Sequence, residues 1–456
     1  MPDHVARTRW GGLSDGRFRP SGYFRVEQDA GVFWLVDPEG GRFISKGINT
    51  VRFDQDRIHD SERFPYAEAC QRKYGSVAAW RMAAAARLAG WGFNTLGAWS
   101  DEAVAHAGPT PLAIDPTLDL GTTFAWQESE PPPKGRRQHF PDVFDPEFER
   151  HITQRARALC GPHSGDPSIL GWFIDNELRW APDWRGPDEL LTLFLNLPPA
   201  SPGRATALTW LQQRYQSFVA FNAIWRSAAN SWQEFAGTAI ITPPHERKPP
   251  YQRDTDSEAT ANRAMPGRAA FAVDCDEFAA LLAERYMALT AAAVRVADAN
   301  HLILGCRFAY PPAPAVIAAA ARHADVISFN CYDPMPDSAL DAYAAVNKPC
   351  LIGEFSFRAA DSGLPNTRGA GPVVADQAQR AASFGSYVNA ALRRPFIVGY
   401  HWFEHADQPA EGRFDGENSN YGTVTIEDRA YDDLTGAMTA LNAAAEDIHA
   451  ATIAVA

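Results

Sequence analysis

The sequence predicts an α/β protein built as a (β/α)8 TIM barrel, preceded by a short N-terminal β-hairpin region and carrying long βα-loop insertions. Three observations lead to this prediction. Short apolar runs of strand length recur along the chain, segments with helical spacing separate most of them, and the opening of the chain alternates as a hairpin instead. Near-continuous apolar runs are typical of strands buried on both faces of a parallel sheet.

The first fifty residues have the alternating pattern that is typical of β-strands. Segment 23–49 alternates as strand, turn, strand, turn, strand, with turn residues at 29–31 and 38–41. We expect residues 1–42 to form a hairpin segment packed on the barrel, and residues 43–456 to form the barrel that carries the functional site.

Helical segments then alternate with apolar runs. The Ala-rich stretch 76–90 has spacing near 3.6 residues and stops at Gly90, and a helix over 145–161 has Asp145 as N-cap and Pro146 in its first position. Further helices are predicted over 204–225, 274–299 and 375–394. The predicted strands are 44–49, 93–99, 111–118, 171–177, 302–308, 326–332, 350–357 and 396–403. The surplus length over a minimal barrel is assigned to loops at 131–140, 180–270 and 404–423.

The chain is acidic, with 55 Asp and Glu against 42 Lys and Arg and a formal net charge of −13 at pH 7. Such a surface repels phosphate backbones, so no nucleic acid and no membrane is expected as a partner. No stretch reaches the ~18 uncharged apolar residues of a membrane span. The opening residues lack the apolar core of a secretory leader, so the expected location is cytoplasmic, and the six scattered Cys are expected to be buried free thiols.

Two carboxylic acids stand at the ends of apolar runs, Glu177 after GWFIDN and Glu354 after CLIG. The carboxyl ends of barrel strands gather at the functional face, and unpaired burial of a charge is costly. Either acid alone could be an ion-paired core residue, with Arg307 or Arg179 as its partner. Both together, on the fourth and seventh strands, favour catalysis.

Glycoside cleavage requires such a pair. One carboxylic acid protonates the departing oxygen, and the other carboxylate attacks the anomeric carbon or activates water. The fourth and seventh strands lie three steps apart around the ring, which lets Glu177 and Glu354 converge on one bond. A separation of ~5–5.5 Å between the two groups would give retention of configuration.

Other side chains at the strand ends suit sugar binding. Asn176 suits a hydrogen bond to a sugar hydroxyl, or a local cap; Tyr332 suits a hydrogen bond that holds Glu354 ionised, or core packing. Trp402 suits the floor on which a sugar ring stacks, or again core packing. The predicted substrate site also includes Trp99, Arg307, Asn330 and His401, and loop tryptophans for further subsites are Trp126, Trp180 and Trp184.

No metal and no cofactor is expected. His401, Glu404, His405 and Asp407 match no standard zinc spacing, and solvated or hydrogen-bonded loop residues are the better interpretation. The segment GGRFISKG lacks the order of a phosphate-binding loop, and no GxSxG serine elbow is present.

The Asn-Glu pair on the fourth predicted strand and the Glu on the seventh resemble those of the retaining β-glycosidases built on (β/α)8 barrels. From about residue 23 to 435 the sequence resembles glycoside hydrolase family 50, the β-agarases. The stretches that carry this resemblance are FWLVDPEGGRFISKGIN (33–49), GWGFNTLGAWSD (90–101), FPDVFDPEF (140–148), GWFIDNEL (171–178), HLILGCRF (301–308), DVISFNCYD (325–333), IGEFSF (352–357) and GYHWFEHADQPAEGRFDGENSNYG (399–422).

The resemblance implies that Glu177 is the general acid/base and Glu354 the nucleophile. It also implies that Asn176 binds the sugar at the scissile bond, that Tyr332 supports the nucleophile and that Trp402 lines the subsite. The residues that it assigns to a pocket-shaping loop are Asp407, Gln408, Arg413, Glu417 and Asn418. The sequence departs from the family's pattern at Ser356, Arg358, Glu404 and His405, close to the implied nucleophile.

We therefore expect a retaining, exo-acting β-glycosidase that hydrolyses β-galactosidic linkages of agarose-type oligosaccharides. The expected partner is an oligosaccharide substrate, and no prediction of oligomeric state is made. Two alternatives stay open: a β-galactosidase or other β-glycosidase acting on a non-agar oligosaccharide, and a sugar-binding barrel without catalysis.

Overall fold

The computed structural model of the chain describes residues 6–127, 140–253, 261, 265 and 267–454. Its strands are β1 (Arg25–Asp29), β2 (Val32–Val36), β3 (Arg42–Phe43), β4 (Ser45–Ile48), β5 (Thr95–Leu96), β6 (Ala113–Ile114), β7 (Gly171–Trp172), β8 (Leu302–Ile303), β9 (Ile327–Asn330), β10 (Cys350–Phe355), β11 (Arg358–Ala359), β12 (Val373–Val374) and β13 (Ile397–Trp402). A six-stranded parallel sheet has the order β6-β5-β4-β13-β10-β9, and β7 and β8 form a separate parallel pair.

Isolated parallel bridges connect these two sheets at both ends. Ile114 pairs with Ile169 before β7, and Phe308 pairs with Phe329 of β9. The parallel strands and the helices around them confirm the α/β prediction. Among the described residues the regular ladders form no single closed barrel, because β5 to β8 have only two residues each in regular pairing.

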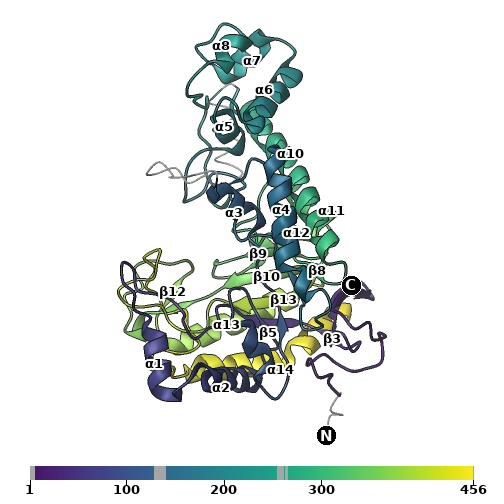
Figure 1. Cartoon of the computed structure of the whole chain (residues 1–456), viewed down its shortest axis with the longest axis vertical. Coiled ribbons are helices and arrows are strands. Elements are labelled where there is room, and N and C mark those ends of the chain that lie inside the picture. The colour runs from purple at the N-terminus through teal and green to yellow at the C-terminus, as the bar shows by residue number, and fades with distance from the viewer. Residues whose placement is uncertain (1–5, 128–139, 254–260, 262–264, 266, 455–456) are drawn as a thin grey trace.

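The helices lie on both sides of the sheet, with α2 and α14 at one side and α4, α10 and α11 at the other (Figure 1). They are α1 (Pro65–Tyr74), α2 (Val77–Gly90), α3 (Leu120–Gln127), α4 (Pro146–Leu159), α5 (Leu190–Leu195), α6 (Pro202–Tyr215), α7 (Phe218–Trp225), α8 (Trp232–Ala236), α10 (Arg268–Ala297), α11 (Pro314–His323), α12 (Asp337–Ala344), α13 (Gln377–Leu392) and α14 (Asp432–Ala450). Short 3-10 turns are η1 (Glu102–His106), η2 (Gly161–His163), η3 (Pro250–Gln252), η4 (Ala360–Ser362) and η5 (Ala451–Ala454).

The predicted helix starts at Val77 and Pro146 are confirmed by their caps. The Ser76 hydroxyl accepts a hydrogen bond from the backbone N–H of Ala79, and the Asp145 carboxylate accepts one from Glu147. Each cap satisfies a backbone donor that the first turn of a helix leaves unpaired. The sequence therefore located these two helices to within one or two residues.

The prediction of a loop over 180–270 is wrong, and the helical stretch predicted over 204–225 is interrupted once. The first range is not a loop but contains a helical lobe, formed by α5 to α8 and η3, at the far end of the long helix α10 (Figure 1). The second is not one helix, because Gln216 takes a left-handed backbone (φ 53°) and Ser217 caps a new helix. The rings of Phe221 and Trp225 stack at 5.5 Å, which gives the lobe an aromatic core. Most of the loop predicted at 131–140 lies outside the described residues.

The N-terminal segment packs against the parallel sheet. The antiparallel strands β1, β2 and β3 form the expected hairpin pattern, and the backbone N–H of Phe33 donates to the carbonyl of Pro395 at 2.8 Å. Phe24 and Phe43 belong to a buried cluster that also contains Leu351 of β10 and Val398 of β13. The hairpin thus covers the amino-terminal end of the sheet, away from the strand ends that carry the predicted site.

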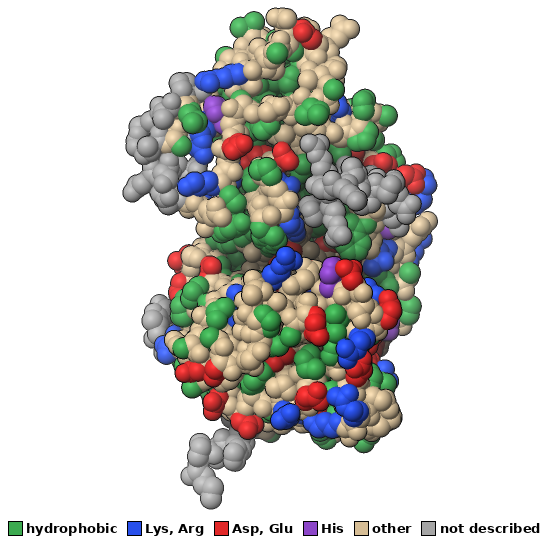
Figure 2. Space-filling view, turned by 90° about the vertical axis from the view of Figure 1, so that its left-hand side faces the viewer, with side chains coloured by type: hydrophobic (Ala, Val, Ile, Leu, Met, Phe, Trp, Pro, Cys, Tyr) green, Lys and Arg blue, Asp and Glu red, His purple; other side chains and the backbone are tan. Residues whose placement is uncertain are grey.

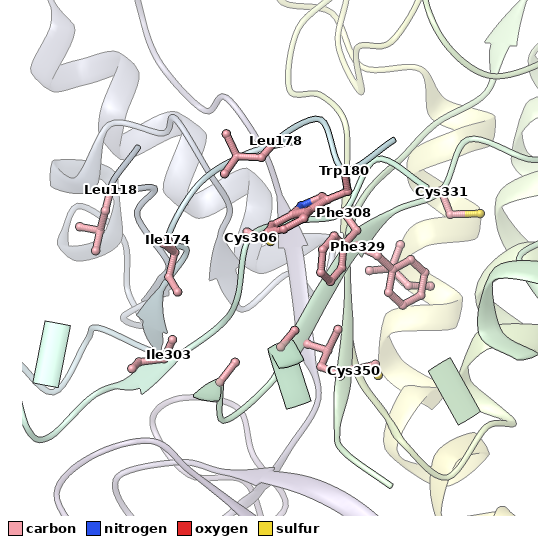
Figure 3. Packing of buried hydrophobic residues seen from close by; sticks show 14 of the residues in the cluster. Leu118, Ile174, Leu178, Trp180, Ile303, Cys306, Phe308, Phe329, Cys331 and Cys350 are labelled. Carbon is pink, nitrogen blue, oxygen red and sulfur yellow. The ribbon is translucent and has the colours of Figure 1, made fainter. Parts of the chain in front are cut away.

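A larger apolar cluster fills the space between the sheet and the helices. In Figure 3, Ile174, Cys306, Phe308 and Phe329 converge from neighbouring segments, with the indole of Trp180 over them. All six cysteines are buried and free, as predicted. Among the described residues, no helix has the length and apolarity needed to cross a membrane.

Asp428 is the centre of a buried polar cluster next to α1 and α2. Its carboxylate accepts hydrogen bonds from the Tyr66 hydroxyl (2.7 Å), the Lys73 ammonium (2.9 Å) and the Arg87 guanidinium (2.8 Å). Burial by itself would raise the pKa of Asp428, but the hydrogen bond and charge of Arg87 outweigh burial and hold the pKa below its ordinary value. Since the folded pKa is depressed, this carboxylate stabilises the fold above its unfolded pKa of about 3.9, and the stabilisation is lost as the pH falls.

We expect Asp428→Asn to lower the free energy of unfolding at pH 7 by about 3–5 kcal/mol, because it leaves buried cations without their counter-charge. The difference from wild type should shrink below about pH 4. Urea unfolding at both pH values measures it. Glu427→Gln is the matched control, since Glu427 is exposed and pairs with exposed Arg72 at 3.2 Å, and such pairs contribute about 0–1 kcal/mol. Equal losses in the two variants would contradict the prediction.

Candidate active site

The backbone turns sharply where five successive parallel strands end. A non-glycine residue with positive φ follows each of them: Thr50 (57°), Trp99 (62°), Asp119 (51°), Glu177 (55°) and Arg307 (46°). This left-handed conformation is disfavoured for residues with a Cβ, and such residues cluster at functional sites. Three of the five, Trp99, Glu177 and Arg307, are predicted site residues.

Glu177 is half-buried and has one amide partner. The Asn330 side chain donates to Glu177 Oε1 at 2.8 Å and lies 3.3 Å from Asn176 Oδ1. Burial, and then the charge of Glu354, raise the pKa of Glu177 to about 7. The group is therefore largely protonated at slightly acidic pH and can donate a proton.

Glu354 has a different environment, with two donors on its carboxylate. It is 5% exposed; Arg307 Nη2 donates to Oε1 at 2.6 Å and the Tyr332 hydroxyl donates to Oε2 at 2.6 Å. These two hydrogen bonds, one of them from a cation, hold both oxygens of the carboxyl group in a fixed orientation. The structure thus contains the Tyr332 and Arg307 contacts that the sequence predicts. It combines one carboxyl group suited to give a proton with one suited to attack.

The end of β10 is shaped for this contact. The register of β10 shifts between Ile352 and Glu354 against β9, and such irregularities re-aim a side chain. A Cβ on Gly353 would stand 2.9 Å from Asn330 Oδ1 and 3.1 Å from Arg307 Nε. Glycine at position 353 therefore lets both partners approach the two acids.

Trp99 is an open aromatic surface beside the acids. It is 36% exposed, its edge meets Phe403, and the guanidinium carbon of Arg307 lies 4.8 Å from its ring centroid. The same carbon lies 4.8 Å from the ring of Phe173. Arg307 is thus fixed between two rings, and its role is to position Glu354, since no part of it is exposed.

Trp402 and His401 do not form the predicted substrate surface. Trp402 is fully buried, donates to the carbonyl of Tyr421 at 2.9 Å and packs against Phe384 of α13. His401 is fully buried, with Nε2 at 2.8 Å from Ser45 Oγ, and burial lowers its pKa to about 3. His401 lies within β13 and Trp402 is its last residue; the Trp402 ring packs on the helix layer, and the His401 ring contacts Ser45 of the neighbouring strand β4.

The loop after β13 contains Asp407, a predicted binding residue. Asp407 is buried and accepts hydrogen bonds from the Asn420 amide (2.8 Å), the backbone of Gly422 (2.9 Å) and the Tyr431 hydroxyl (2.6 Å). These contacts hold the loop together. Sugar contact by Asp407 stays a prediction.

Glu417 and Asn418 are half-buried and serve the same loop. Glu417 accepts from Gln408 (3.0 Å) and Arg413 (2.8 Å), and Asn418 Oδ1 accepts from the backbone N–H of Thr367 at 3.0 Å. These contacts join the loop after β13 to the loop after β10. Sugar contact by either residue stays a prediction.

The remaining residues singled out from the sequence fall into two groups. The buried group consists of Ser356, Arg358, Glu404, His405 and Trp180, so Trp180 is no subsite surface. The exposed group consists of Trp126 and Trp184.

Across the described ranges, no three His, Cys, Asp or Glu side chains are grouped to hold a metal ion.

Arg185 is a site residue that the sequence analysis missed. Its Nη1 donates to the backbone carbonyl of Glu177 at 2.5 Å, and its charge lowers the pKa of Glu177, against the larger effect of burial. Asp183 binds the same guanidinium through Nε at 3.0 Å. The only available signal was the D-x-R spacing a few residues after the acid, which is too common to be specific.

We expect Asn330→Ala to raise the pKa of Glu177 further, because the amide hydrogen bond favours the charged carboxylate. A 13C NMR titration with labelled Glu measures this pKa directly. Asn389→Ala on α13, where Asn389 contacts Arg393 instead of the site, is the matched control. An unchanged or lower pKa in Asn330→Ala would contradict the assigned hydrogen bond.

No family model matches the chain. It is 27% identical over 507 residues to β-agarase B of Vibrio sp. (strain JT0107), covering 96% of this chain and 50% of that protein. It is 31% identical over 492 residues to β-agarase A of the same strain, covering 92% of this chain and 45% of that protein. The chain therefore spans about half the length of the curated relatives it matches.

Solved structures give the same result. One described as an exo-β-agarase superposes with a TM-score of 0.78 at 25% identity, covering 98% of this chain and 68% of that one. PfGH50B, at 24% identity and a TM-score of 0.76, covers 97% and 69% and shares the fold. These matches confirm the resemblance found in the sequence: the chain is β-agarase-like and resembles glycoside hydrolase family 50 over nearly its whole length.

Proposed function

We propose that this chain is a retaining β-glycosidase that hydrolyses β-galactosidic linkages of agarose-type oligosaccharides in an exo manner. One observation carries the proposal: Glu177 and Glu354 stand at the ends of two parallel strands in different environments, one with its pKa raised to about 7 by burial and by the charge of Glu354, and the other held by Arg307 and Tyr332. Pairs of acids whose environments differ in this way are typical of acid–nucleophile pairs. The similarity to β-agarases, one of them exo-acting, supports the substrate class.

We also propose that the two parallel sheets together form the closed (β/α)8 barrel. The strand order and the bridges at Ile114–Ile169 and Phe308–Phe329 support it, because they connect β6 to the β7 segment and the β8 segment to β9. Residues 1–42 would then be the segment that covers the base of the barrel, and residues 43–456 the catalytic unit. Strand ends that converge at one mouth explain why Glu177 and Glu354 meet.

In the first step of the proposed reaction, Glu354 attacks the anomeric carbon and a covalent glycosyl ester forms. The bond from that carbon to the bridging oxygen breaks as Glu177 gives this oxygen its proton. In the second step, Glu177 takes a proton from water while the water oxygen attacks the same carbon. The ester bond then breaks, Glu354 returns as a carboxylate, and the sugar leaves with its original β configuration.

The neighbouring side chains have defined parts in this scheme. Asn330 holds Glu177 in place, and Arg307 and Tyr332 orient the attacking carboxylate. Asn176 and the open ring of Trp99 are free to meet the sugar at the scissile bond, as Asn176 has only a 3.3 Å contact with Asn330. No step needs a cofactor.

The test is product analysis with a panel of agaro-oligosaccharides and other β-linked galactosides. Wild type should release a single small product from the agarose-type members of the panel, detected by mass spectrometry. Exo action requires that this product is the one released from the first minutes onward. Glu411→Gln, which changes an exposed carboxylate, is the control and should behave as wild type. If the protein cleaved only the non-agar galactosides, its substrate would be a non-agar oligosaccharide. If it bound members of the panel but cleaved none, this would favour a sugar-binding barrel.

A further inference from the structure

Three aromatic rings form a row outside the two catalytic carboxyl groups. Trp184 is 62% exposed and Tyr251 is 49% exposed, while Tyr310 is buried between them. The Tyr310 ring centroid lies 6.4 Å from that of Trp184 and 5.7 Å from that of Tyr251. The three rings, here called the aromatic row, therefore form one surface with two open faces.

The aromatic row is tied directly to the proposed acid. The guanidinium carbon of Arg185 lies 4.7 Å from the Trp184 ring centroid, and its Nη1 donates to the Glu177 carbonyl at 2.5 Å. Asp183 accepts from Arg185 and stands 3.3 Å from the Tyr310 hydroxyl. Because Arg185 is held by these groups, the exposed Trp184 ring keeps a fixed position relative to Glu177.

The position of the row in the fold follows from the elements that carry it. Trp184 is in the segment that leads from β7 to α5, and Tyr251 is in η3, so the row lies where the sheet meets the helical lobe. Figure 2 shows a hollow in the molecular surface between the lobe and the part that contains the sheet. Hydrophobic side chains lie around this hollow.

We propose that the aromatic row binds the sugar unit on the leaving-group side of the scissile bond, an inference that rests on the proposed function. The acid must contact the bridging oxygen, so the departing sugar lies beside Glu177, where the row is anchored. The C–H face of a sugar ring suits stacking on an indole or phenol ring, whose rigid apolar face loses little entropy on binding. The aromatic row would thus raise kcat/KM for oligosaccharides relative to substrates with a small leaving group.

The test compares two substrates of the same released saccharide: the agaro-oligosaccharide itself and the β-fluoride of that saccharide, whose leaving group is no sugar. We expect Trp184→Ala and Tyr251→Ala to lower kcat/KM for the oligosaccharide by about 10- to 100-fold, and by far less for the fluoride. Trp184→Phe keeps a ring and should recover most of the loss. Val219→Ala, which alters an exposed apolar residue on α7, is the control.

The possible outcomes separate the two proposals. If wild type cleaves the oligosaccharide and both alanine variants keep its kcat/KM within about twofold, the aromatic row is not the leaving-group site, while the proposed function stands. Equal losses on both substrates also contradict the inference. If wild type cleaves neither substrate, calorimetric titration with the oligosaccharide decides: weaker binding by Trp184→Ala than by wild type supports the row, and equal or absent binding overturns it.

Discussion

Glu354→Gln should abolish turnover while leaving the fold intact, with kcat lower by on the order of 10^4-fold or more. The amide has the shape of the carboxylate, so the contacts at Arg307 and Tyr332 keep a partner of the same size. It is a poor nucleophile, however, and cannot form the glycosyl ester that the reaction requires.

Initial rates on the agarose-type oligosaccharide measure this loss, and the thermal midpoint verifies that the variant is folded. Glu411→Gln makes the same chemical change at an exposed position and should keep the wild-type rate. If Glu354→Gln kept more than about one hundredth of the wild-type kcat, the assignment of Glu354 as nucleophile would be wrong.

Glu177→Gln should remove the pH dependence that the acid imposes. Glu177 must be protonated to act in the first step, and burial and the charge of Glu354 raise its pKa to about 7. The wild-type kcat/KM should therefore fall as the pH rises through about 7. In Glu177→Gln we expect kcat/KM for the oligosaccharide to fall by about 10^2- to 10^4-fold and the decline near neutral pH to disappear.

Rates from pH 5 to 9 on the oligosaccharide and on the corresponding β-fluoride measure this effect. Fluoride needs little proton donation to leave, so the first step with this substrate should lose much less in the variant. A variant that keeps the wild-type alkaline decline would show that another group titrates, and Glu177 would no longer be the acid.

The two acids could be predicted from the sequence because strand ends meet at one edge in a parallel α/β fold. Glu177 and Glu354 each follow an apolar run directly, and Tyr332 follows another, so their meeting required only the strand order. Trp402 and His401 could not be assigned in this way. Apolar runs buried on both faces do not say which side chains reach the surface, and these two are fully buried although β13 ends at Trp402.

The extent of the helical lobe, beyond the helical stretch predicted over 204–225, was missed for a related reason. Pro pairs near residues 243–250 favour loops, whereas the lobe is stabilised by contacts between residues far apart in sequence, such as Arg214 with Asp274 and Trp225 with Asp274. The break at Gln216 had no sequence signal either, because Gln is an ordinary helix residue. Position 185 likewise gains its importance only from the fold, which brings its guanidinium to the carbonyl of Glu177.

The central claim is that Glu177 and Glu354 form a retaining acid–nucleophile pair, and proton NMR of the first product tests it most directly. Wild-type protein is mixed with the agarose-type oligosaccharide, and the anomeric signals are recorded before mutarotation. The account predicts that the β anomer of the new reducing end appears first and the α anomer only as the sugar equilibrates. An α anomer in the first spectra would mean inversion, and Glu354 would then activate water instead of forming a bond to the sugar.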